Sequence, residues 1–281
     1  MANILITGAN GQLGTELRNR SFSLLDDVFY TDIEELDITN FKAICSFIET
    51  HDIDTIINCA AYTAVDQAEE DEEKAMKLNR DAVANLANAA VKLDCLLLHI
   101  STDYVFDGQG TRPWEPDDER HPLNVYGQTK YEGELAVEEL LDKYFIVRIA
   151  WVFGVNGKNF IKTMLRLGKE RGKVSVVNDQ IGSPTYTYDL ARLLVDMIQT
   201  DKYGRYHATN EGLCSWYEFA CEIFKKAGMD SVEVTPVTSA EYPAKAARPF
   251  NSRMSKEKLT ENGFERLPSW QDALERYLKL I

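Results

Sequence analysis

The sequence predicts an α/β protein built on a doubly wound parallel sheet, with a smaller lobe at its C-terminal end. Short apolar runs alternate with helix-period segments through the first half of the chain. A glycine-rich corner follows the first of these runs. With 281 residues, the chain is longer than a usual single core. We therefore expect a main domain over residues 1–150, completed by part of residues 173–210, and an interleaved second lobe over residues 151–281.

The strands of the main domain are expected where short apolar runs are bounded by polar residues, at residues 3–7, 28–31, 55–58, 96–101 and 145–149. Helix-period apolar residues lie between them, at residues 12–21, 41–50, 71–93 and 126–141. Thr39 or Asn40 would cap the second of these helices. This alternation is typical of strand–helix–strand units in a parallel sheet.

The pattern after Trp151 is less regular. Helices are expected at residues 160–171, 187–200, 215–227 and 269–280, and strands near residues 173–177 and 205–209. Ser269, which follows Pro268, would cap the last helix. We expect this lobe to close over a ligand in a cleft shared with the main domain.

The composition restricts the partners and the compartment. A net charge of −14 argues against a nucleic acid or an anionic membrane as a partner, because both need a cationic surface. Five cysteines without a CxxC pair fit a reducing cytoplasm better than a zinc site or a disulfide framework. No stretch approaches the about 20 apolar residues of a membrane span. We therefore expect a cytoplasmic protein.

The glycine-rich corner predicts a nucleotide site. Gly8, Gly11 and Gly14 stand between the first strand and the first helix. Glycine lets the backbone turn sharply and approach a pyrophosphate, whose charge the helix N-terminus stabilises. In this context the trio indicates a Rossmann-type dinucleotide-binding domain. A tight turn that binds nothing is the alternative.

Asp32 follows the second strand and predicts which dinucleotide binds. Its carboxylate can accept hydrogen bonds from both adenosine ribose hydroxyls and would repel a 2′-phosphate, which favours NADH and leaves NADPH open. An exposed loop carboxylate is the alternative. Asp37 and Ile38 could hold the adenine edge, and small residues follow the third strand where a flat cofactor would pass. The residues expected to contact the dinucleotide are Gly8, Asn10, Gly11, Gln12, Leu13, Gly14, Asp32, Asp37, Ile38, Cys59, Ala60, Ala61, Tyr62, Ile100, Tyr126 and Lys130.

Tyr126 and Lys130 are four residues apart on an expected helix, so they share a face. An ammonium near the phenol would lower the pKa of Tyr126 and make proton exchange easier. Thr102, directly after an apolar run, could hold a substrate carbonyl oxygen. A tyrosine and a lysine at this spacing would alone mean nothing. Within a nucleotide-binding frame, Thr102, Tyr126 and Lys130 are predicted to be catalytic.

These features resemble the extended short-chain dehydrogenase/reductase superfamily and, within it, the dTDP-4-dehydrorhamnose reductase family. The glycine spacing, the Tyr-x-x-x-Lys pair and the preceding Ser-Thr carry the first resemblance. The second extends almost from end to end and rests on specific strings at residues 58–69, 101–108, 122–130, 148–153, 178–185 and 248–252.

The resemblance implies reduction of the 4-keto group of dTDP-4-dehydro-L-rhamnose, with hydride from NAD(P)H and Tyr126 as proton donor. A dTDP-sugar would then be the partner. Related dehydratases carry an Asp-Glu pair after the Thr, whereas Asp103 is followed here by Tyr104, which argues for plain reduction. Arg248 suits a diphosphate because guanidinium pairs with phosphate oxygens, although it could be an ordinary surface residue. The residues expected to contact the sugar nucleotide are Val65, Thr102, Asp103, Tyr104, Trp151, Gln180, Pro184 and Arg248.

Several alternatives stay open. The chain could be a reductase or epimerase of another nucleotide sugar, or a regulatory subunit that binds a dinucleotide without using it. Some relatives are described with magnesium at a dimer interface. Glu16 matches one ligand position, but Tyr188 stands where another carboxylate would be, so no metal is predicted and a homodimer stays open. His99 and His207 fall in strand patterns and are expected to be packed rather than catalytic.

Overall fold

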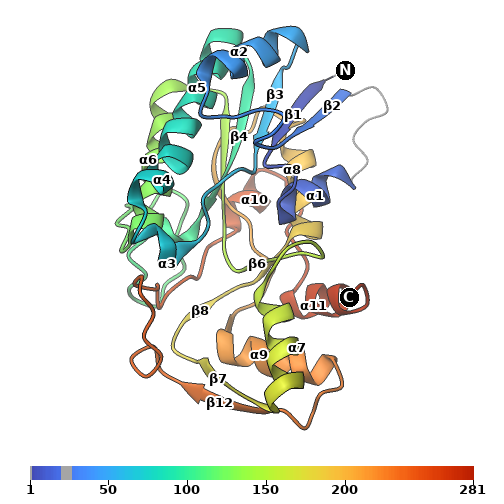
Figure 1. Ribbon diagram of the computed structural model, residues 1–281. Coiled ribbons are helices and arrows are strands. Elements are labelled where there is room, and N and C mark those ends of the chain that lie inside the picture. The colour runs from blue at the N-terminus through green and yellow to red at the C-terminus, as the bar shows by residue number, and fades with distance from the viewer. Residues whose placement is uncertain (1, 20–26) are drawn as a thin grey trace.

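A six-stranded parallel sheet forms the centre of the protein. The computed structural model describes residues 2–19 and 27–281 (Figure 1). The strand order is β10-β5-β4-β3-β1-β2, and every neighbouring pair runs parallel. The predicted doubly wound parallel sheet is therefore confirmed. Its strands are β1 (Asn3–Thr7), β2 (Asp27–Thr31), β3 (Thr55–Asn58), β4 (Leu96–Thr102), β5 (Tyr144–Ile149) and β10 (Gly204–His207).

Helices cover both faces of this sheet (Figure 1). Ile4 and Ile6 of β1 pack in the core beneath α1 and α8, whereas Leu5 packs in the core on the opposite face. This alternation follows from the two-residue period of a strand, and apolar residues on both faces are typical of a buried parallel sheet. The first face is covered by α1 (Gln12–Arg18) and α8 (Thr187–Met197), and the second by α2 (Phe41–Thr50), α5 (Ala82–Leu93) and α6 (Val125–Leu140).

The predicted helix boundaries hold to within a few residues. Asn40 caps α2, because its side chain accepts a hydrogen bond from the Ala43 amide. Helix α6 starts one residue earlier than predicted, and α8 ends three residues earlier, at Met197 instead of residue 200. The expected end of the first helix at residues 20 and 21 lies outside the described residues.

The single helix predicted over residues 71–93 is wrong in one respect. It is divided into α4 (Glu72–Met76), a π-helical turn η1 (Lys77–Asp81) and α5. The turn holds Asn79, whose amide nitrogen donates to the Tyr62 carbonyl and the Thr129 hydroxyl, and whose amide oxygen accepts from the Tyr62 N–H. Gly133 of α6 packs so closely that a Cβ there would collide with the Asn79 carbonyl. Tertiary contacts with α6 therefore override the local helical pattern.

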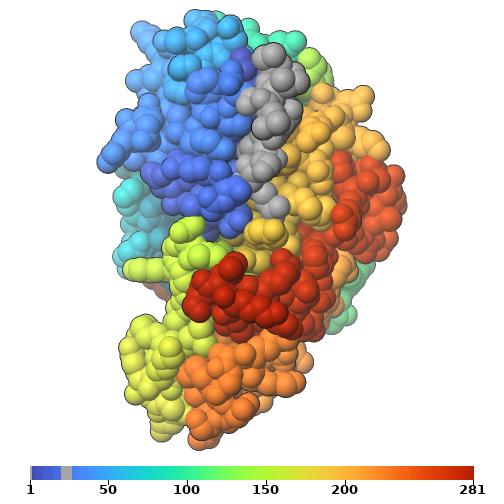
Figure 2. All heavy atoms as spheres, turned by 90° about the vertical axis from the view of Figure 1, so that its right-hand side faces the viewer, coloured from blue at the N-terminus to red at the C-terminus, as the bar shows by residue number. Residues whose placement is uncertain are grey.

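The C-terminal lobe has its own core. In Figure 2 its yellow-green and orange atoms form a projection below the blue and gold atoms of the main domain. A parallel pair, β7 (Lys173–Val177) and β12 (Glu233–Val237), packs with α7 (Phe160–Arg171), α9 (Trp216–Lys226) and α11 (Trp270–Leu278). Ser269 caps α11 as predicted, by accepting a hydrogen bond from the Asp272 amide. Strand β12 was not predicted, because it contains Pro236 and several exposed residues.

Several short elements were not indicated by the sequence. They are α3 (Val65–Ala68), the 3-10 turn η2 (Asp103–Val105), β6 (Val152–Phe153), β8 (Ile181–Gly182), β9 (Thr185–Tyr186), β11 (Cys214–Ser215) and α10 (Glu257–Glu261). No helix within the described residues is both long and apolar enough to cross a membrane.

Candidate active site

The glycine corner forms a tight turn between β1 and α1. Gly8 has φ +65°, and a Cβ on it would lie 2.6 Å from the Ala60 nitrogen. A Cβ on Gly14 would collide with the Gly8 carbonyl, so this glycine lets α1 pack against the turn. Gly11 precedes the first turn of α1, and no side chain among the described residues caps it. The first amides of this helix are therefore available to an anion.

A cavity of about 320 Å³ lies beside this corner. Asp32 is held at its edge, because its Oδ2 accepts from the Asn10 amide at 3.0 Å and its Oδ1 from the Ile33 amide at 2.9 Å. Hydrogen bonds from the Thr39 amide and hydroxyl lower the pKa of Asp37, which lies on the same wall. The predicted dinucleotide residues that line this cavity are Gly8, Gly11, Asp32, Asp37, Ile38, Cys59, Ala60 and Ala61.

A second cavity, of about 360 Å³, shares Gly11, Cys59 and Ala61 with the first. It contains all three predicted catalytic residues. It therefore brings residues predicted for the dinucleotide together with residues predicted for the sugar. These are Gln12, Leu13, Ile100, Tyr126 and Lys130 from the first set, and Val65, Thr102, Asp103, Tyr104 and Trp151 from the second.

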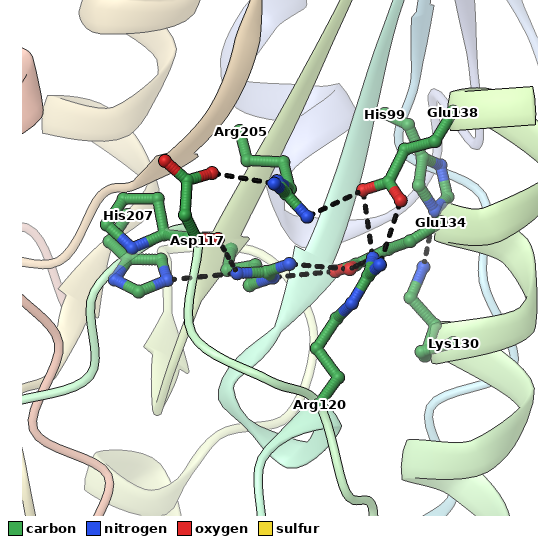
Figure 3. Close-up of polar contacts among 10 residues, drawn as sticks. His99, Asp117, Arg120, Lys130, Glu134, Glu138, Arg205 and His207 are labelled. Atoms are coloured by element: carbon green, nitrogen blue, oxygen red, sulfur yellow. Dashed lines mark hydrogen bonds and ion pairs between the residues drawn. The ribbon is translucent and has the colours of Figure 1, made fainter.

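The electrostatics of Tyr126 differ from the expectation. Burial raises the pKa of this phenol, and a hydrogen bond with Thr102 only partly opposes the increase. Lys130 does not lower it: its Nζ donates to the Ile100 carbonyl at 2.7 Å and lies 3.1 Å from His99 Nε2 (Figure 3). The expected lowering of the Tyr126 pKa by Lys130 is therefore wrong in this structure, because the amine is directed at β4 and the phenol is desolvated.

Asp103 lies next to this pair. Its carboxylate accepts hydrogen bonds from the hydroxyls of Thr102 at 3.1 Å and Ser252 at 2.6 Å. Burial raises the pKa of Asp103 to about 6, although these hydrogen bonds oppose the increase. The hydroxyl of Thr102 therefore connects the Tyr126 phenol to a buried carboxyl group.

Buried ion pairs anchor the helix that carries Tyr126 and Lys130. Glu134, one turn beyond Lys130 on α6, accepts from Arg148 Nε at 2.8 Å and from Arg148 Nη2 at 2.7 Å, and neither side chain is exposed. Arg120 Nη1 adds a third bond at 2.8 Å (Figure 3). Arg148 belongs to β5, so these bonds fix the position of α6 against the sheet.

A third cavity, of about 650 Å³, opens toward the C-terminal lobe and shares Val65 and Tyr104 with the second. Arg248 and Gln180 line it. Arg248 Nη2 is 2.7 Å from Asp66 Oδ2, and Gln180 Nε2 donates to Ser239 Oγ at 2.9 Å. The three cavities form one series with shared walls, from the glycine corner to the second lobe.

Four predicted residues line none of these three cavities. Gly14 packs α1 against the turn, and the Asn10 amide holds Asp32. Tyr62 is bonded through its backbone to Asn79, and the Pro184 carbonyl accepts from the Asn210 amide.

Two residues of an aromatic wall, Trp216 and Phe160, were missed in the sequence, whereas Trp151 was predicted to contact the sugar nucleotide. Trp216 stacks on Trp151 with ring centroids 3.8 Å apart, and Phe160 packs on Trp216. Trp151 has φ +51°, which is uncommon for a non-glycine residue and turns the chain directly after β5. Trp216 and Phe160 both line the third cavity. Each is the first residue of a helix, but neither helix has a motif that indicates a ligand.

Comparisons with known proteins show the family of the chain. The family model described as the RmlD substrate binding domain matches residues 1–281. The chain belongs to this family. A dTDP-4-dehydrorhamnose reductase from Aggregatibacter actinomycetemcomitans is 44% identical, over 98% of this chain and 97% of that protein. The family prediction is therefore confirmed.

Two solved structures have nearly the same fold. A dTDP-4-dehydrorhamnose reductase from Clostridium acetobutylicum is 45% identical, with a TM-score of 0.96 and 99% of each chain covered. The same enzyme from Bacillus anthracis, solved in complex with NADP, is also 45% identical, with a TM-score of 0.96 and 100% of each chain covered.

Proposed function

We propose that this protein reduces the 4-keto group of dTDP-4-dehydro-L-rhamnose to a hydroxyl group, giving dTDP-L-rhamnose, with hydride from NADH or NADPH. The observation that carries the proposal is the position of Thr102, Tyr126 and Lys130 in the cavity that joins the other two. The activities of the relatives support the substrate, and the NADP complex of the Bacillus anthracis enzyme supports the cofactor.

The residues present fit a dinucleotide. Gly8 and Gly11 line the first cavity without side chains, and the uncapped first turn of α1 suits a pyrophosphate. Asp32 is placed to accept hydrogen bonds from a ribose. When bound, a reduced nicotinamide supplies the hydride.

Tyr126 provides the proton. As negative charge develops on the sugar oxygen, the phenol O–H breaks and the alcohol O–H forms, leaving a tyrosinate. Because burial raises the pKa of Tyr126, the phenol keeps its proton at neutral pH until this transfer. Thr102, bonded to Tyr126, orients the phenol, and Lys130, in the same cavity, would hold the nicotinamide ribose.

The remaining predicted residues hold the sugar nucleotide. Tyr104 and Trp151 border the reacting end, and Arg248 and Gln180 border the cavity that fits the nucleoside diphosphate. Arg248 would exchange Asp66 for a phosphate oxygen when substrate binds. We place the reaction in the cytoplasm, because all five cysteines are free thiols, as in a reducing compartment.

Replacing Tyr126 by Phe tests the proposal. General acid catalysis is worth roughly 10²–10⁴-fold, so turnover of NADH with the keto sugar should fall by that factor while dinucleotide binding is retained. Tyr131→Phe is the matched control, because this tyrosine lies on the same helix with its ring against Arg120 and should retain turnover. Full turnover in Tyr126→Phe would refute the assignment.

A further inference from the structure

A buried chain of hydrogen bonds runs behind Lys130. Asn58 at the end of β3 contacts His99 of β4, with Asn58 Nδ2 and His99 Nδ1 3.0 Å apart. The other ring nitrogen of His99, Nε2, lies 3.1 Å from Lys130 Nζ (Figure 3). Asn58 and His99 are fully buried, and only 2% of Lys130 is exposed. None of these contacts was expected from the sequence, where His99 was a packed residue.

The backbone fixes the direction of this chain. The Ala60 N–H donates to Asn58 Oδ1 at 3.1 Å, and the Thr7 hydroxyl donates to the same oxygen at 2.7 Å. A backbone N–H can only donate, so the oxygen of the Asn58 amide must face Ala60 and its nitrogen must face His99. His99 Nδ1 therefore accepts a hydrogen bond and carries no proton.

The proton of His99 must then be on the other nitrogen. Burial lowers the pKa of His99 well below its usual value, so the ring is neutral. A neutral imidazole with a bare Nδ1 carries its proton on Nε2. This N–H is directed at Lys130 Nζ, where an uncharged amine has a lone pair to accept it and an ammonium has none.

The surroundings of Lys130 shift its pKa in opposite directions. Burial lowers the pKa of Lys130 to about 8, whereas Glu134 on the same helix opposes the decrease. Burial raises the pKa of the Cys59 thiol to about 12, and burial also raises that of the Tyr126 phenol, so both are uncharged near neutrality. Among these neighbours, His99 is the one that directs an N–H at the amine.

We propose that His99 is a positioning residue: its ring N–H faces the Lys130 amine and favours the uncharged form of that amine. Lys130 can therefore exchange a proton near the pH of the reaction, beside the phenol that must be reprotonated in each cycle. The kinetic consequence rests on the proposed function, whereas the tautomer of His99 does not.

The tautomer can be measured directly in the unmodified protein. Heteronuclear NMR of isotopically labelled imidazole rings distinguishes a proton on Nε2 from one on Nδ1. We expect His99 to be neutral and protonated on Nε2 between pH 6 and pH 8, a window of about two units around neutrality. A proton on Nδ1, or a doubly protonated ring, would overturn the inference, whether or not the protein is a reductase.

The pH dependence of kcat/KM tests the consequence. The side-chain carbonyl of His99→Gln can accept a hydrogen bond from the Lys130 ammonium, which raises the pKa of Lys130. The decline of kcat/KM at alkaline pH should therefore move up by about one pH unit. His207→Gln is the matched control, because His207 is also buried but contacts Arg148 instead of Lys130. An unchanged profile in His99→Gln, or an equal shift in the control, would contradict the proposal.

Discussion

Tyr126 illustrates what a sequence can and cannot show about a single residue. Its spacing from Lys130 identified the pair, because four residues on a helix place two side chains on one face. The sequence could not show that Lys130 is directed at Ile100 and His99, or that burial raises the pKa of the phenol. Those properties depend on β4, which is distant in the chain.

Asp32 carries the prediction of cofactor choice. Asp32→Asn keeps an oxygen for the Asn10 amide but removes the charge that would repel a 2′-phosphate. We expect the ratio of kcat/KM for NADH to that for NADPH to fall about tenfold, which corresponds to about 1.4 kcal/mol. Both dinucleotides belong in the assay, because the Bacillus anthracis relative was solved with NADP. Glu34→Gln, a nearby exposed carboxylate, should leave the ratio unchanged, and a wild-type preference for NADPH would contradict the role given to Asp32.

At the scale of elements, α6 connects the site to the stability of the fold. Tyr126, Lys130 and Glu134 follow one another at intervals of four residues along this helix. The first two line the central cavity, and the third is bonded to Arg148 and Arg120. The sequence predicted the helix to within one residue at each end. It did not predict that both arginines would converge on Glu134, because they come from separate segments.

Glu134→Gln should therefore destabilise the protein. Removing one partner of a buried ion pair leaves an uncompensated charge and costs roughly 3–5 kcal/mol, measurable by denaturant unfolding. Glu139→Gln, an exposed position on the same helix, should change the free energy of unfolding by about 0.5 kcal/mol or less.

The same carboxylate predicts a pH dependence of stability. Burial alone would raise the pKa of Glu134, but Arg148 and Arg120 lower it to about 2, from an ordinary value of 4.5. Its contribution is therefore present above pH 4.5 and is lost as the pH falls toward 2. Glu134→Gln should lose this part of the acid sensitivity, and an unchanged acid profile would show that Glu134 is not the titrating group.

At the scale of the molecule, the sequence was most informative where signals are local. The glycine corner and the apolar strand runs predicted the sheet, and Asn40 and Ser269 predicted helix starts. Trp151 was predicted, but the packing of Trp216 and Phe160 around it was not, because these residues start separate helices of the second lobe. The first two cavities lie at the carboxyl ends of the strands, where ligands of open parallel sheets bind, and the third continues into the C-terminal lobe.

The most direct test of the proposed reaction follows the hydride itself. The protein is incubated with dTDP-4-dehydro-L-rhamnose and a reduced dinucleotide that carries deuterium at the transferable position, and the sugar product is analysed by NMR and mass spectrometry. We predict dTDP-L-rhamnose with a single deuterium on the carbon that bore the keto group. Deuterium on another carbon, or a converted sugar with the dinucleotide still reduced, would contradict a 4-keto reductase.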